Sequence, residues 1–333
     1  MTHRAPLALP VAASVLALAL AGCSAPAGGA DAEAAGIRIV ASTNVYGDIA
    51  ATVAGDAAEV TSIIRDAGQD PHEYEATSRD ALALSGADLV IVNGGGYDAF
   101  MGTLLDAHGG DPIVLDAVEL AGLEGEDGHD HEHDHGESGE HGEGDEHGDH
   151  EHDHAHAHDH SVNEHVWYDL HVMEHLAEEL AEHLADLDPA HAEQFAANAA
   201  AFVDGIGELE SAASAIAAAH DGARVAITEP VPVYLLEAAG LENVTPAEFS
   251  QAIEEGADAP ALVVLDVVEL VSGGSVAFLA YNEQTVGPQT DQVLAAAEAA
   301  GTPVVSFSEL LPEGEHYLDW MAANLAAIEA ALA

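Results

Sequence analysis

A histidine-rich tract occupies residues 128–165, near the middle of the chain. Between His129 and His160 it holds twelve of the 22 histidines, almost all interleaved with Asp, Glu or Gly. Imidazole is the commonest side-chain ligand for borderline transition metals, and carboxylates add charge and oxygen ligands. We therefore interpret the tract as an auxiliary metal-binding segment; a solvated spacer is the alternative. The auxiliary ligands would be His129, His131, His133, His135, His150, His152, His154, His156, His158 and His160.

The same tract has almost no apolar side chains. A segment that buries nothing cannot offset the cost of ordering its backbone. The composition therefore predicts a disordered, acidic loop over residues 124–160.

Three further side chains stand at predicted strand ends or in loops, where open α/β sheets bind ligands. His72 follows Pro71, which stiffens the turn that aims the imidazole. His165 lies where the tract ends, and Glu229 follows an apolar strand over 224–228. Each histidine alone is only a weak indication of a metal site. Together the three side chains would place a metal ion between two halves of the molecule.

The elements that must position these residues alternate between strand and helix in the first half of the chain. We expect strands at 37–41, 59–64, 88–92 and 113–115, and helices at 45–53, 77–85 and 97–107. Such alternation predicts a mostly parallel sheet with helices on both faces.

Two Ala-rich, helix-favouring segments follow, at 170–187 and 189–219. The second would be about 45 Å long, more than a compact domain needs, and we expect it to link two lobes. A second alternating set then begins. Its expected strands are 224–228, 261–265, 276–281 and 303–307, and its expected helices are 231–239, 288–300 and 317–331. The predicted fold class is α/β, with two lobes that are each a mostly parallel sheet flanked by helices.

The net charge of −56 is extreme, because the only basic residues besides histidine are five arginines. Without the 15 carboxylates of residues 124–160 the charge would still be −41. Such a surface repels phosphate backbones, which argues against nucleic acid as a partner, and it concentrates cations. A general surface adaptation is the alternative explanation.

The N-terminus has the pattern of an export signal. Residues 7–21 are apolar but too few to span a bilayer as a mature helix, and they end at Gly22-Cys23. This pattern resembles a bacterial lipoprotein signal, which predicts a signal peptide over 1–22, a lipidated Cys23 and a flexible linker over 23–36. Cys23 is the only cysteine, so no intramolecular disulfide can form. The expected location is the extracytoplasmic face of the cytoplasmic membrane.

Three blocks and the insertion resemble the zinc/manganese solute-binding proteins of ABC transporters, the cluster A-I metal-binding lipoproteins. The blocks are GQDPHEY at 68–74, ADLVIVNG at 87–94 and EHVWYD at 164–169, with the acidic histidine-rich insertion before the last. The resemblance implies two α/β lobes joined by one long rigid helix. We expect the first lobe at 37–187, the linking helix at 188–220 and the second lobe at 221–333.

The resemblance also implies a ligand set. His72 and His165 match the first two ligands of the family. The third ligand is usually histidine, where this chain has Glu229. The fourth is usually aspartate, and Glu309 is the nearest acidic candidate. Two imidazoles with one or two carboxylates suit Zn(II), and also Mn(II) or Fe(II).

The function implied is capture of Zn(II) in the interlobe cleft by a lipid-tethered monomer and its delivery to an ABC permease with its ATPase. The tract would then collect metal or sense its sufficiency. One alternative is a zinc hydrolase, since two His and one Glu with an open position also hold catalytic zinc, although none of the predicted helices carries an HExxH motif. Another is a surface protein that buffers metal through the tract alone. His171 and His175, at helical i, i+4 spacing, either bind a metal together or form a polar helix surface.

Overall fold

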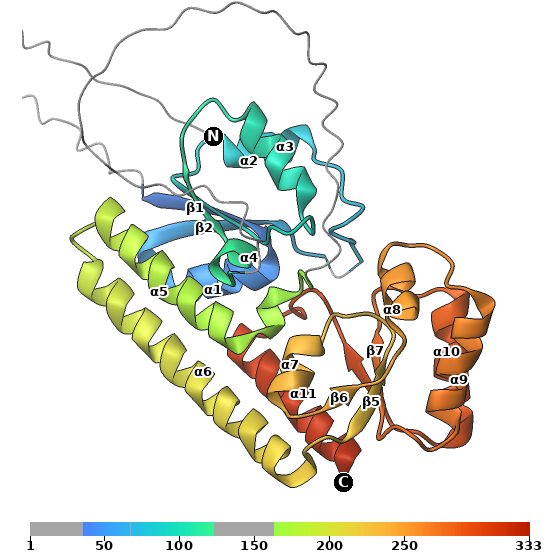
Figure 1. The fold of residues 1–333 in the computed structure, drawn as a ribbon. Helices are drawn as coiled ribbons and strands as arrows, with labels where there is room; N and C mark the ends of the chain where they lie inside the picture. The colour runs from blue at the N-terminus through green and yellow to red at the C-terminus, as the bar shows by residue number, and fades with distance from the viewer. Residues whose placement is uncertain (1–35, 67, 123–162) are drawn as a thin grey trace, which may run out of the picture. The chain divides into compact units, whose positions relative to one another are not determined.

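The computed structural model describes residues 36–66, 68–122 and 163–333 (Figure 1). The described residues belong to one compact unit that begins at Gly36. The predicted signal peptide, Cys23, nearly all of the linker and the histidine-rich tract lie outside them. Within the described ranges, no helix combines the length and apolar character needed to cross a membrane.

The first sheet is parallel throughout, as the alternating pattern predicts, with strand order β2-β1-β3-β4. Its strands are β1 (Ile37–Thr43), β2 (Ala58–Ile64), β3 (Leu89–Val92) and β4 (Ile113–Asp116). Its helices are α1 (Asn44–Ala54), α2 (Ser78–Leu84), α3 (Ala99–Ala107) and α4 (Ala117–Leu120). All four residues of β3 are buried, which is typical of a strand covered on both faces.

The second sheet repeats this layout, with parallel strands in the order β6-β5-β7-β8. Its strands are β5 (Arg224–Ile227), β6 (Glu242–Asn243), β7 (Leu279–Asn282) and β8 (Val304–Phe307). Its helices are α7 (Val233–Ala238), α8 (Ala247–Glu254), α9 (Ala261–Ser272), α10 (Pro288–Ala300) and α11 (Tyr317–Leu332). Neither α8 nor β6 is among the predicted elements, and β6 is only two residues long.

The strand predicted at 261–265 is wrong, because these residues begin helix α9. The helix buries Val264, Val267 and Val271, a spacing of three and four, while Leu262 is 76% and Leu265 is 54% exposed. A short run of Val and Leu does not by itself distinguish a strand from a buried helix. Here one face of the helix packs its valines on the core, and the other face carries Leu262 and Leu265.

Helices α5 (Leu170–Leu187) and α6 (Ala192–His220) lie side by side, and α6 is the long helix that the sequence predicts (Figure 1). Helix α6 packs on α1 and α5 and also on α7 and α11, so it contacts both halves of the chain. The largest hydrophobic cluster joins Ile39 of β1, Phe202 of α6 and Phe307 of β8. The two sheets therefore share one core along α6. The lobe limits at 187 and 220 stay a prediction.

Candidate metal centre

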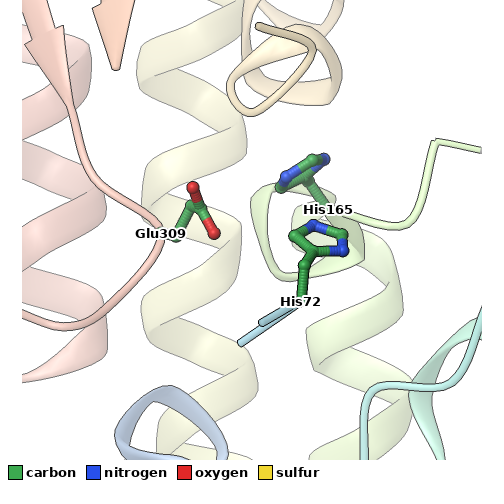
Figure 2. Close-up of side chains that lie close together, drawn as sticks. All are labelled: His72, His165 and Glu309. Atoms are coloured by element: carbon green, nitrogen blue, oxygen red, sulfur yellow. The ribbon is translucent and has the colours of Figure 1, made fainter. Parts of the chain in front are cut away.

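His72, His165 and Glu309 come together at one point of the structure (Figure 2). One ligand atom from each side chain lies within 4.8 Å of the others. They come from three separate segments: the loop after β2, the residue before a short 3-10 helix (Val166–Tyr168), and the segment after β8. The structure thus brings together three of the four predicted ligands, from both halves of the chain.

A tight turn holds His72. Its backbone N–H donates to Asp70 Oδ1 at 2.9 Å, and Pro71 lies between the two residues. The imidazole stands edge-on to Tyr97, with ring centroids 5.0 Å apart. The turn predicted from the Asp-Pro-His sequence is therefore present, and an aromatic ring supports the imidazole.

Tyr97 reaches the site because the chain turns sharply after β3. Asn93 follows that strand, and Gly94, Gly95 and Gly96 come next with φ angles of 79°, 64° and 102°. Side chains other than glycine rarely adopt such angles, and a Cβ at Gly94 would lie 2.1 Å from the Asp116 carboxylate. The glycines thus allow the turn that buries Tyr97 between the metal-ligand candidates.

His165 is almost completely buried, at 1% exposure. Its Nδ1 lies 2.8 Å from Asn163 Oδ1, an acceptor, so Nδ1 carries the proton and Nε2 keeps a lone pair for a metal. Burial lowers the pKa of His165 well below its ordinary value, and the charge of His72 adds to this. The ring is therefore neutral at physiological pH, which is the form that binds metal ions.

Glu309 is also buried, at 6% exposure. It accepts hydrogen bonds from Tyr97 Oη at 3.3 Å and from Asn282 Nδ2 at 2.8 Å. The pKa of Glu309 is raised to about 7, mainly by burial and also by the charge of Asp70, against the hydrogen bonds from Asn282 and Tyr97, which lower it. A buried carboxylate of this kind is stabilised in its ionised form by a bound cation.

Glu229 lies next to the three-residue group but outside it. It is buried, and Asn282 Nδ2 donates to both Glu229 and Glu309. Burial raises the pKa of Glu229 to about 8. Among the described residues, Glu229 belongs to no group of three side chains whose ligand atoms all lie within 4.8 Å of one another. Its role as a direct ligand stays a prediction.

Two carboxylates that the sequence analysis did not select lie against the histidines. Glu164 Oε1 is 3.3 Å from His72 Nε2, and Glu254 Oε1 is 3.6 Å from His165 Nδ1. Burial, followed by the charges of neighbouring carboxylates, raises the pKa of each to about 8. Glu164 could have been found, since it adjoins His165 in the EHVWYD block. Glu254 could not, because it ends α8, a helix that the pattern did not predict.

The histidine pair on α5 is present as its spacing suggests. His171 Nε2 and His175 Nε2 lie 3.1 Å apart, and His171 groups with Glu174 and Glu210. Both imidazoles are exposed, so the pair lies on the helix surface.

Residues 39–331 match the family model described as ZnuA, zinc-uptake complex component A, periplasmic. The chain belongs to this family. The match spans both sheets and every residue of the candidate metal centre.

Two curated relatives are named for manganese and for metal in general. The manganese-binding lipoprotein MntA of Halalkalibacterium halodurans is 27% identical over 259 residues, 77% of this chain and 75% of that protein. The metal ABC transporter substrate-binding lipoprotein ScbA of Streptococcus cristatus is 28% identical over 203 residues, 58% of this chain and 56% of ScbA.

The fold is also found in a solved structure. The periplasmic zinc-binding protein TroA of Treponema pallidum superposes with a TM-score of 0.67 at 18% identity, covering 90% of this chain and 99% of TroA. This confirms the predicted α/β fold with two parallel sheets.

Proposed function

We propose that this ZnuA-family protein binds one divalent transition-metal ion through His72, His165 and Glu309, with Glu229 as a candidate fourth ligand. The ion is cargo: the protein captures it outside the cytoplasm and delivers it to an ABC permease with its ATPase. The convergence of two imidazoles and one carboxylate from three distant segments carries this proposal. Zn(II) is the cargo that we assign, and Mn(II) or Fe(II) is the alternative, because this ligand set suits all three.

The surroundings of the candidate ligands favour transport over hydrolysis. His165 and Glu309 are 1% and 6% exposed, only His72 of the three is exposed, and no described helix carries the HExxH motif that supplies a catalytic zinc with its general base. The relatives named above are likewise metal-binding or substrate-binding lipoproteins. We infer that Cys23 carries the lipid that tethers the protein to the extracytoplasmic face of the membrane, and that it acts as a monomer.

Metal titration with a competing chelator, with the bound ion identified by native mass spectrometry, tests the proposal. The protein and a His72→Ala/His165→Ala variant are compared, with His183→Ala, an α5 surface residue, as the matched control. We expect the control to retain one tight Zn(II) and the double variant to lose it.

Two results would contradict the proposal. Tight binding that survives in the double variant would assign the site to other residues, including the histidine-rich tract. Tight binding that is lost only when residues 127–160 are deleted would favour the metal-buffering alternative.

A further inference from the structure

A cavity of about 590 Å³ adjoins the metal centre, and His72, Glu164 and Glu254 contribute to its lining. A water molecule takes up roughly 30 Å³ of liquid volume, so the cavity has room for a cation with its complete first hydration shell. None of its lining residues is Lys or Arg, while Asp70, Glu73 and Glu255 add further carboxylates. The cavity beside the metal centre therefore has the volume and the carboxylate lining that a hydrated cation requires.

The side chains around His72 form two groups that share its imidazole. The inner group is His72, His165 and Glu309, and the outer group is His72, Glu164 and Glu254. In each group, one ligand atom per residue lies within 4.8 Å of the others. The outer carboxylates are 16% and 21% exposed, whereas the inner residues other than His72 are almost completely buried.

The chemistry of the two groups also differs. The outer group is mainly carboxylate oxygen, which suits a cation that keeps its water. The inner group adds a second, buried imidazole, which suits a dehydrated borderline metal.

We propose that the outer group is a docking position for a hydrated divalent cation, which then passes through His72 to the inner group. This inference rests on the proposed function. The exposed carboxylates of Asp70, Glu73 and Glu255 in the cavity lining attract cations toward the docking position, and such fields raise association rates by about 10- to 1,000-fold.

A docking position on the path has a specific kinetic signature. Removing one outer carboxylate raises the barrier between solvent and the inner group without removing an inner ligand. We expect Glu164→Gln and Glu254→Gln each to slow both association and dissociation by about tenfold, while Kd changes by less than about threefold.

The chain contains its own probe for this measurement. The Trp167 ring lies 5.1 Å from the His165 ring, centroid to centroid, so its fluorescence reports on the inner group even when metal also binds elsewhere on the chain. Stopped-flow mixing with Zn(II), and separately with Mn(II), gives the association rate. Chasing the loaded protein with EDTA gives the dissociation rate. Glu248→Gln is the matched control, because Glu248 is exposed on α8, the helix that ends at Glu254, and the same carboxyl-to-amide change is made there.

The outcomes separate the two proposals. Rates equal to those of Glu248→Gln would overturn the docking position. So would a weaker Kd with faster dissociation and unchanged association, because Glu164 and Glu254 would then be ligands of the inner group. An unsubstituted protein that binds no Zn(II) or Mn(II) tightly would instead refute the proposed function itself.

Discussion

The amide of Asn282 lies between the two buried carboxylates of the second half of the chain. Its Nδ2 donates to Glu229 and to Glu309, although the Glu309 group alone includes both histidines. Residues that orient a metal ligand typically contribute about 10- to 100-fold to metal affinity. Substituting Glu229 and substituting Glu309 should therefore weaken metal binding to different extents, although each residue follows the end of a strand.

Glu309→Gln and Glu229→Gln test this difference at the residue scale. We expect Glu309→Gln to weaken Zn(II) binding by more than about 100-fold, because a carboxylate ligand is lost, and Glu229→Gln to weaken it by about tenfold. Competition titration against a chelator of known affinity measures both. Equal losses would show that Glu229 also binds the ion.

At the scale of elements, α6 is the support common to both sheets. Phe202 is 2% exposed, and its ring centroid lies 5.8 Å from that of Tyr317 on α11. Tyr317 in turn donates from Oη to the carbonyl of Trp167, next to the metal centre, at 2.7 Å. The packing of α6 thus extends to the segment that holds His165.

Phe202→Ala should lower the free energy of unfolding by about 3–5 kcal/mol, because it leaves a cavity in the shared core. Glu208→Ala, at an exposed position of the same helix, should change it by less than about 0.5 kcal/mol. Urea denaturation of the metal-free proteins measures both values. If Phe202→Ala were as mild as Glu208→Ala, α6 would not support a common core.

At the scale of the whole molecule, the excess of carboxylates extends into the interior. Burial raises the pKa of Glu164, Glu229 and Glu254 to about 8 from an ordinary value of 4.5. Between these values the unfolded chain has released protons that the folded chain still binds. A rise in pH through this window therefore favours the unfolded state. The loss of folding stability is complete above about pH 8.

We expect the melting temperature of the metal-free protein to fall as pH rises from 5 to 8. The triple variant Glu164→Gln/Glu229→Gln/Glu254→Gln should show a shallower fall, because it lacks the three groups. Differential scanning calorimetry at constant ionic strength measures both profiles. Parallel profiles would mean that the dependence comes from surface charge and not from the buried carboxylates.

Local patterns determined most of the secondary structure, because periodicity and helix-favouring composition act over a few residues. Helices α5 and α10 begin and end where predicted, and the strands of the first sheet are found within a few residues. The strand predicted at 261–265 is wrong because only tertiary packing decides which side of a short apolar run is buried. The acidic, cation-binding character of the chain and the candidate ligands His72, His165 and Glu309 could also be predicted from the sequence.

Only the tertiary structure decided which carboxylates meet the histidines. Glu254 comes from an unpredicted helix of the second half and lies against His165 of the first. Glu229, equally plausible in the sequence, accepts a hydrogen bond from Asn282 and belongs to none of the three-residue groups among the described residues. Proximity across the chain depends on how the two sheets pack along α6, and no local pattern of residues encodes that distance.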